Sequence, residues 1–187
     1  MALLSGLRPD EMVPSIVDVD LDALQGRGIK GLLIDVDNTL IPHGVPEMDA
    51  ERLAWAQRAV ERFSVCLLSN AIRGTRVKVL SELLDVPGVY GWLWDRKPFA
   101  LSIRRGLAHT RTKPSETAMI GDQLFTDILA GNRSGLYTIW VEAISATDFF
   151  LTRLINRRVE RMLVRSMLDG EPLAVETPAP EREADDA

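Results

Sequence analysis

The segment LLIDVDNTLIPHG, residues 32–44, places two carboxylates, Asp35 and Asp37, directly after an apolar run. Carboxylates at such a position can attack a phosphoryl group, transfer a proton or bind a divalent cation. A lone D-x-D pair is more often a solvated turn. The EF-hand calcium loop does not fit, because Leu40 and Pro46 stand where that loop needs Gly and Glu. Other polar residues must therefore decide between a turn and a site.

Polar residues also follow two later apolar runs. Ser69 and Asn70 end the run SVCLL, Asp122 follows TAMIG with Asp127 five residues later, and Lys97 precedes a predicted helix. Ligands of an open parallel sheet bind outside the carboxyl ends of its strands, so we expect these groups to meet at one edge. Each residue alone has an ordinary structural explanation. The joint arrangement of acids, hydroxyl and ammonium favours a Mg²⁺ site, because Mg²⁺ prefers oxygen ligands.

The apolar spacing predicts strands that alternate with helices. Near-continuous apolar runs are typical of strands buried on both faces, and apolar residues at helical spacing separate them. Strands are expected at 31–36, 64–70, 89–94, 117–121 and 136–141, and helices at 49–63, 73–84, 98–110 and about 124–133. Asp49 is the expected N-cap of the first helix. This alternation predicts an α/β fold with a central parallel sheet covered on both faces.

The two ends of the chain differ from this core. Residues 1–28 are interpreted as an N-terminal lead-in that packs on the core, residues 29–148. Residues 149–168 form an amphipathic helix by pattern, with five arginines and one glutamate. This helix either packs on the core or binds an anionic membrane, and the sequence leaves both open. Residues 169–187 hold seven acids and three prolines, which predicts a disordered acidic tail.

Composition narrows the class of protein. The chain is 46% hydrophobic and 26% charged, as folded proteins are, and its net charge of −5 argues against nucleic-acid binding. One cysteine, Cys66, excludes an internal disulfide, fits a reducing compartment and is expected in the core. No apolar run reaches the length of a membrane span, and the N-terminus lacks a signal pattern. We expect a cytoplasmic protein, with peripheral contact at the inner face of the membrane.

The motifs resemble a known superfamily. Asp35-Val-Asp-Asn-Thr39 is similar to the D-x-D-x-T signature of the haloacid dehalogenase (HAD) superfamily. Ser69, Lys97 with Pro98, and GDQLFTD at 121–127 are similar to its second, third and fourth motifs, in the right order. Residues 7–40 and 121–141 also resemble the YqeG-like, subclass IIIA phosphatases, which are similar to phosphatidylglycerophosphate phosphatases of mitochondria and plastids. The resemblance covers about residues 7–163.

The resemblance implies a HAD-like three-layer Rossmannoid fold and a Mg²⁺-dependent phosphomonoester phosphatase. Asp35 would be the nucleophile that forms an aspartyl-phosphate. Asp37 would act as general acid and base, and its backbone carbonyl would bind the metal. Asp122 would complete the metal site, and Asp127 would bind through water or orient Lys97.

The resemblance also implies how the substrate is held. Ser69 would donate a hydrogen bond to the transferring phosphoryl group, Lys97 would balance its charge, and Thr39 would steady the nucleophile loop. The residues expected to bind substrate are Thr39, Ser69, Asn70 and Lys97. His43, Trp92 and Trp94 lie near these motifs, but their roles stay open.

The motif spacing implies a site without a cap domain (C0 type). Only 33 residues separate Asp35 from Ser69, and 27 separate Ser69 from Lys97. An open edge suits a substrate whose bulk stays outside, such as a lipid headgroup, a protein or a nucleic-acid end. The resemblance makes phosphatidylglycerophosphate, a phospholipid with a phosphate ester in its headgroup, the preferred substrate. The alternatives are a soluble phosphomonoester, with subunit packing in place of the cap, and a non-catalytic binding module. The oligomeric state stays open.

Overall fold

The computed structural model describes residues 6–42, 45, 47–69, 74–90 and 100–144. The chain divides into a compact unit, residues 1–148, and a second unit, residues 149–187. The second unit, which holds the predicted basic helix and acidic tail, lies outside the described residues. Five residues singled out in the sequence also lie outside them: His43, Asn70, Trp92, Trp94 and Lys97.

A single parallel sheet organises the described residues. Its strands are β1 (Glu11–Val13), β2 (Gly31–Asp35), β3 (Ser64–Ser69), β4 (Gly88–Tyr90), β5 (Thr117–Gly121) and β6 (Tyr137–Val141). They lie in the order β1-β6-β5-β2-β3-β4, and every pair is parallel. The predicted α/β fold with a central parallel sheet is confirmed.

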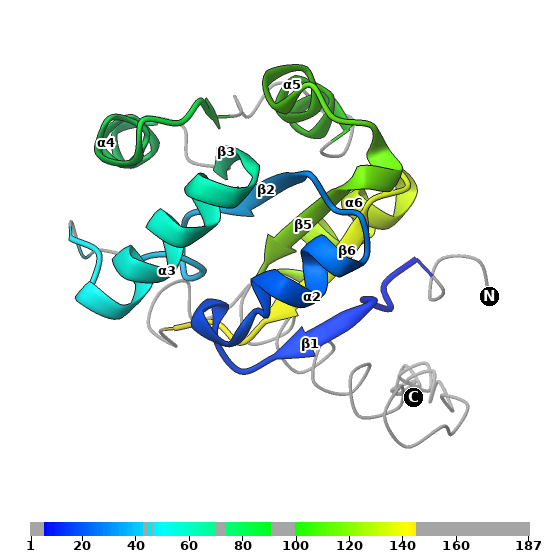
Figure 1. The fold of residues 1–187 in the computed structure, drawn as a ribbon, viewed down its shortest axis with the longest axis horizontal. Coiled ribbons are helices and arrows are strands. Elements are labelled where there is room, and N and C mark those ends of the chain that lie inside the picture. Colours follow the sequence, from blue (N-terminus) through cyan, green and yellow to red (C-terminus); the bar gives the residue numbers. More distant parts are fainter. Residues whose placement is uncertain (1–5, 43–44, 46, 70–73, 91–99, 145–187) are drawn as a thin grey trace, which may run out of the picture. The chain divides into compact units, whose positions relative to one another are not determined.

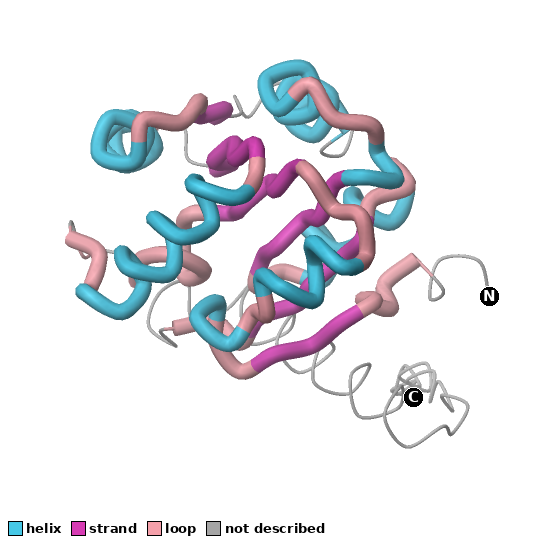
Figure 2. The backbone as a smooth tube through the Cα atoms, viewed as in Figure 1, coloured by secondary structure: helices cyan, strands magenta, loops and turns pink. Residues whose placement is uncertain are grey.

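Helices cover both faces of the sheet, which gives three layers (Figures 1 and 2). Alternate residues of β2 point to opposite faces: Leu32 and Ile34 join one apolar cluster, and Leu33 joins the other. The first cluster packs under α2 (Leu21–Gly26), α3 (Ala50–Arg62) and α4 (Thr75–Leu84). The second packs under α5 (Ala100–Thr110) and α6 (Leu129–Arg133). Cys66 belongs to the second cluster, so its predicted place in the core is confirmed.

Three short helical turns complete the described residues. They are the 3₁₀ turns η1 (Ile16–Asp18) and η2 (Pro114–Glu116) and the π-helical turn η3 (Leu124–Ile128). The predicted N-cap is confirmed, because the Asp49 side chain accepts a hydrogen bond from Arg52 N–H at the start of α3. Within the described part of the chain, no helix is long and apolar enough to cross a membrane.

The lead-in forms elements that the apolar pattern did not indicate. Its strand β1 lies at the edge of the sheet and pairs with β6, from Glu11 opposite Ile139 to Val13 opposite Val141. Its helix α2 is capped by Asp20, whose side chain accepts hydrogen bonds from two backbone N–H groups. A three-residue strand and a six-residue helix are too short for an apolar period to be recognised.

The strand order creates one crevice at the carboxyl edge of the sheet. From β2 the chain runs through α3 to β3 on one side, whereas from β5 it runs to β6 on the other side. The carboxyl ends of β2 and β5 therefore lie together where the strand order reverses, which is where open α/β sheets bind ligands. Asp35 is the last residue of β2, and Asp122 is the first after β5.

We expect Trp55→Phe to destabilise the fold. Trp55 of α3 is 1% exposed, and its indole N–H donates to the Val19 carbonyl of the lead-in at 3.1 Å. The substitution leaves that carbonyl without its donor and should lower the free energy of unfolding by about 1–3 kcal/mol, measured in urea. Tyr90→Phe, at a 40% exposed position, is the control and should cost less than about 0.5 kcal/mol. Equal losses in both variants would contradict the packing of the lead-in on α3.

Candidate active site

Asp35 sits at the end of the central strand, where burial and a tight loop fix it. Its side chain is 3% exposed. The next residue, Val36, still pairs with β3, because its N–H donates to the Leu68 carbonyl at 3.0 Å. The chain then turns at Asn38, whose φ of 63° is left-handed and is tolerated by asparagine. The Ile41 N–H closes this turn on the Val36 carbonyl. The turn makes Asp35 the last residue of the strand and places Asp37 in the loop.

Asp122 and Asp127 reach the same edge from β5 and the π-helical turn that follows it. The Gln123 carbonyl accepts hydrogen bonds from both Asp127 N–H and Ile128 N–H, which widens the first turn of the helix. Asp127 Oδ2 in turn accepts the Gln123 N–H at 3.0 Å. A Cβ on Gly121 would lie 2.3 Å from Asp127 Oδ2, so the absence of a side chain there lets Asp127 approach the strand. π-helical turns are rare and often mark functional sites.

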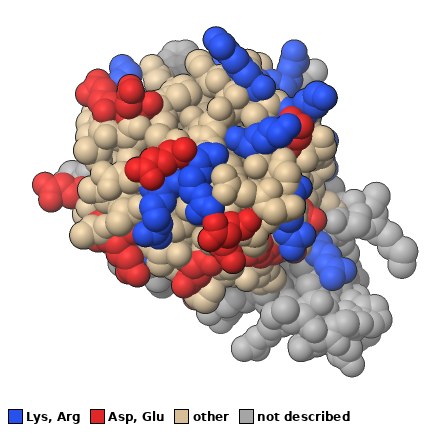
Figure 3. Space-filling model, in the orientation of Figure 1, with Lys and Arg blue, Asp and Glu red and all other residues tan. Residues whose placement is uncertain are grey.

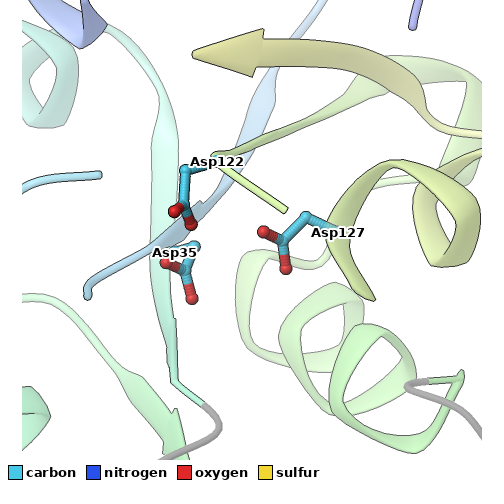
Figure 4. Close-up of side chains that lie close together, drawn as sticks. All are labelled: Asp35, Asp122 and Asp127. Carbon is cyan, nitrogen blue, oxygen red and sulfur yellow. The ribbon is translucent and has the colours of Figure 1, made fainter. Parts of the chain in front are cut away.

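Three carboxylates converge in this crevice. Asp35, Asp122 and Asp127 each offer an oxygen, and these three atoms lie within 4.8 Å of one another. All three side chains are buried, and in Figure 4 they point toward one another from separate elements. The sequence predicted this meeting from the strand ends, and the structure brings these three residues together.

Three ionised carboxylates in this crevice would repel one another. Burial raises the pKa of Asp35 well above its ordinary value, and the charges of Asp127, Asp122 and Asp37 raise it further. The Thr39 side chain lowers the pKa of Asp35, but by less than burial raises it. Two unit charges about 4 Å apart repel by roughly 4 kcal/mol at an effective dielectric constant of 20. The cluster therefore favours either protonation of Asp35 or a bound cation.

The donor set fits Mg²⁺. Asp35 Oδ2 is buried and accepts no hydrogen bond from the described residues, so it has a lone pair available for a cation. The cluster offers only carboxylate oxygens, which are hard ligands, and Mg²⁺ is bound by a few carboxylates together with water. The metal itself remains a prediction from this fit and from the superfamily resemblance.

Asp37 turns its side chain to different partners, although it lies only two residues from Asp35. Asp37 Oδ2 accepts a hydrogen bond from the Ser69 hydroxyl at 2.9 Å, and Oδ1 accepts one from Arg76. Its side chain is 20% exposed, unlike the buried three. The carboxylate of Asp37 is not part of the cluster. A role in metal binding would therefore fall to its backbone carbonyl, as the resemblance implies.

The other described residues of the predicted site surround Asp35. Ser69 is 4% exposed and Thr39 is 1% exposed. A small cavity of about 10 Å³ lies beside Asp35, with Ser69, Asp127 and Ser102 of α5 in its wall. The wall from α5 was not predicted. Lys97 and Asn70 lie outside the described residues, so their predicted roles are untested.

Two supporting residues were also missed by the sequence analysis. The Trp140 indole on β6 donates to the Asp122 carbonyl at 2.8 Å and so holds the backbone of a cluster residue. Arg76 of α4 donates to Asp37. Nothing in one sequence marks either residue, because each acts across elements that are far apart along the chain.

Comparison with known proteins identifies the family. The model of the HAD-hydrolase-like family matches residues 95–145. The probable phosphatase YqeG of Bacillus subtilis is 36% identical over 160 residues, which cover 85% of this chain and 90% of that protein. The chain belongs to the YqeG family of HAD-like phosphatases. The family suggested by the motifs is confirmed, and the chain is a phosphatase.

Two further relatives of this YqeG-family chain are named for a lipid substrate. The mitochondrial phosphatidylglycerophosphatase GEP4 of Saccharomyces cerevisiae is 53% identical over 152 residues, covering 72% of this chain and 77% of that protein. The chloroplastic phosphatidylglycerophosphate phosphatase 1 of Chlamydomonas reinhardtii is 28% identical over 165 residues. That match covers 83% of this chain but only 60% of the algal protein, so the algal protein is considerably longer than the shared part.

We expect Gly121→Ala to impair the acid cluster. The new methyl group would lie 2.6 Å from Asp127 Cβ and Cγ, so Asp127 must move away. The Mg²⁺ concentration that gives half-maximal phosphate release should rise at least about tenfold, since roughly 1 Å of displacement is costly at a reacting site. Gly26→Ala is the matched control, because nothing lies within 4 Å of its added methyl group. An unchanged Mg²⁺ requirement in Gly121→Ala would contradict the close approach of Asp127.

We expect Asp35→Asn to stabilise the metal-free protein at pH 7. Because the pKa of Asp35 is raised in the folded state, its contribution to stability is full at low pH. That contribution is lost as the pH rises above the unfolded value of about 3.9. Thermal unfolding in EDTA at pH 7 should occur at a higher temperature for Asp35→Asn than for wild type, and Mg²⁺ should stabilise wild type more than the variant.

Asp49 provides a control of opposite sign. The Arg52 backbone N–H lowers the pKa of Asp49, so its ionised form stabilises the fold at pH 7. Asp49→Asn should therefore give no stabilisation in EDTA. A lower unfolding temperature for Asp35→Asn than for wild type in EDTA would show that the cluster is not electrostatically strained.

Proposed function

We propose that this phosphatase is Mg²⁺-dependent, forms an aspartyl-phosphate on Asp35 and acts on phosphatidylglycerophosphate. The observation that carries the proposal is the convergence of three buried carboxylates at the carboxyl ends of β2 and β5, with oxygens within 4.8 Å. A second acid, Asp37, lies beside them in the nucleophile loop. One group can thus attack while another transfers the proton.

The proposed reaction has two steps. In the first, an Asp35 oxygen forms a bond to phosphorus while the bond from phosphorus to the alcohol oxygen breaks, and Asp37 gives its proton to that oxygen. In the second, water forms a bond to phosphorus, Asp37 takes the proton of that water, and the bond to Asp35 breaks. The products are the alcohol and inorganic phosphate, and both carboxyl groups return to their starting states. The protonated Asp37 is needed most when the leaving alcohol is a poor leaving group.

Mg²⁺, when bound, would reduce the repulsion between the carboxylate nucleophile and the phosphate ester. Asp35, Asp122 and Asp127 would hold it with side-chain oxygens, and Asp37 with its backbone carbonyl. Ser69 and Thr39 border the nucleophile and would bind the phosphoryl group. Lys97 and Asn70 are proposed as further phosphate-binding residues on the superfamily resemblance alone.

Two observations support a lipid substrate. Two relatives are named as phosphatidylglycerophosphate phosphatases. Among the described elements, only α3 lies between β2 and β3, so the spacing leaves no room for a large inserted cap. A headgroup can then enter an open edge while the acyl chains stay outside.

The membrane contact is also part of the proposal. We propose that the protein works in the cytoplasm at the inner face of the membrane, with the basic segment 149–168 near anionic lipid. On the face shown in Figure 3, acidic and basic side chains are interspersed. Arg62 of α3 and Asp22 of α2 form an ion pair. That face lacks the continuous basic surface that nucleic-acid binding needs.

Phosphate release from a substrate panel tests the proposal. The panel contains phosphatidylglycerophosphate in vesicles, glycerol 3-phosphate, sugar phosphates and nucleotides, each with Mg²⁺ or with EDTA. We expect the lipid to have the highest kcat/KM and EDTA to remove activity on every substrate. Asp35→Asn should lower kcat by at least about 10³-fold, because the amide is a poor nucleophile.

Glu51→Gln, a substitution at an exposed position of α3, is the control and should keep wild-type turnover. If a soluble ester has a higher kcat/KM than the lipid, the proposed substrate is wrong and a small metabolite takes its place. The proposed catalytic residues would be unaffected by that result. Normal turnover by Asp35→Asn would contradict the covalent mechanism.

A further inference from the structure

Arg76 connects the predicted general acid to the loop that carries it. Its Nη1 donates to Asp37 Oδ1, and its Nη2 donates to the carbonyls of Pro42 at 2.5 Å and Val45 at 2.6 Å. The guanidinium therefore contacts three acceptors of the segment that begins at Asp37. Both side chains are largely shielded, with 25% of Arg76 and 20% of Asp37 exposed. Partly shielded ion pairs of this kind restrict side-chain geometry more than surface pairs do.

The position of Arg76 is itself fixed by packing. Val77 and Leu80 bury α4 against the sheet, at 1% and 2% exposure. The helix begins after Gly74, whose φ is 55°, and an added Cβ there would lie 2.6 Å from the Tyr90 ring. The first turn of α4 is therefore held against β4, and Arg76 extends from it toward the nucleophile loop.

We propose that Arg76 is a positioning residue that holds the Asp37 carboxyl group in the orientation required for proton transfer to the leaving alcohol. The inference rests on the proposed role of Asp37 as general acid and base. Arg76 and the Ser69 hydroxyl bind different oxygens of Asp37, so together they fix the rotation of its carboxyl group. Of these two partners, Ser69 alone remains when Arg76 is removed. The Asp37 carboxyl group can then turn away from the leaving oxygen.

A lysine cannot replace this arginine. One ammonium group has a single nitrogen, whereas Arg76 uses two nitrogens of a planar fork to bind one carboxylate oxygen and two carbonyls. Three of the five N–H groups of Arg76, including both on Nη2, already donate to protein oxygens, which favours a role in holding Asp37 over a role as a phosphate ligand. Arg76 acts through Asp37 and does not itself touch the reacting atoms.

The test compares two leaving groups in the full-length protein with Mg²⁺. p-Nitrophenyl phosphate needs little protonation of its leaving group, whereas 2-phenylethyl phosphate, an alkyl ester, needs a positioned acid. Arg76→Ala should lower kcat/KM, which reports the steps up to departure of the alcohol, by about 10- to 100-fold on the alkyl ester and by less than about 3-fold on the aryl ester. Arg76→Lys should show the same selective loss. The ratio of kcat/KM on the alkyl ester to kcat/KM on the aryl ester does not depend on the fraction of folded enzyme, so partial unfolding cannot imitate this result.

Lys78→Ala is the matched control on the same helix, because Lys78 contacts the Tyr90 ring and, among the residues that the structure describes, no residue of the site. It should leave the ratio unchanged. The Arg76→Ala substitution should also have little further effect in an Asp37→Asn background, since both substitutions remove the same function.

The outcomes separate this inference from the proposed function. A normal ratio in Asp37→Asn would show that Asp37 is not the general acid, and the proposed mechanism would fail. A lowered ratio in Asp37→Asn, with a wild-type ratio in Arg76→Ala, would overturn only the positioning role. A higher KM for both esters with unchanged kcat would make Arg76 a substrate-binding residue, which also overturns it.

Discussion

The repulsion among three buried carboxylates is the constraint on which the rest of the site depends. Asp35, Asp122 and Asp127 offer oxygens within 4.8 Å of one another, in a place where burial already raises the pKa of Asp35. Such a cluster costs stability unless a proton or a cation offsets its charge. Ionisable groups with strongly shifted pKa values are typical of functional sites, so the cluster indicates function. A bound divalent cation would account for both the number of acids and their shared direction.

The fold tolerates this cost because rigid elements hold the three acids. Asp35 ends the central strand, and the apolar residues before it are buried on both faces. Asp127 is held by the Gln123 N–H inside a π-helical turn. It packs against the end of β5, where residue 121 is glycine. The Trp140 indole fixes the Asp122 backbone from a third strand. The stability of the sheet thus offsets the strain in the crevice.

Two acids of one short motif have opposite environments. Asp35 is buried among like charges, whereas Asp37 accepts hydrogen bonds from Ser69 and Arg76. The turn at Asn38 produces this separation, because the strand ends at Asp35 and the loop carries Asp37 toward α4. The proposed nucleophile and the proposed proton donor thus have different surroundings within three residues, and a cation bound at Asp35 would favour the ionised form that attack requires.

Much of this arrangement follows from the sequence, and the reasons for the rest are physical. The buried strands were predictable because their apolar runs are nearly continuous, and the cluster followed because parallel strands end at a common edge. Strand β1 was not recognised, because three residues carry no measurable period. Arg76 was missed because its partner lies 39 positions away and only the fold brings them together. The sequence shows a glycine at position 121, but its closeness to Asp127 depends on the π-helical turn and could not be predicted.

The most direct test of the account is to find the residue that carries phosphate during turnover. The enzyme is acid-quenched in the steady state with p-nitrophenyl phosphate, reduced with borohydride and mapped by peptide mass spectrometry. Reduction of an aspartyl-phosphate leaves homoserine in its place. We predict homoserine at position 35 when Mg²⁺ is present, and none with EDTA or in Asp122→Asn. Homoserine at any other position, or equal labelling of position 35 in EDTA, would contradict a cation-dependent nucleophile at Asp35.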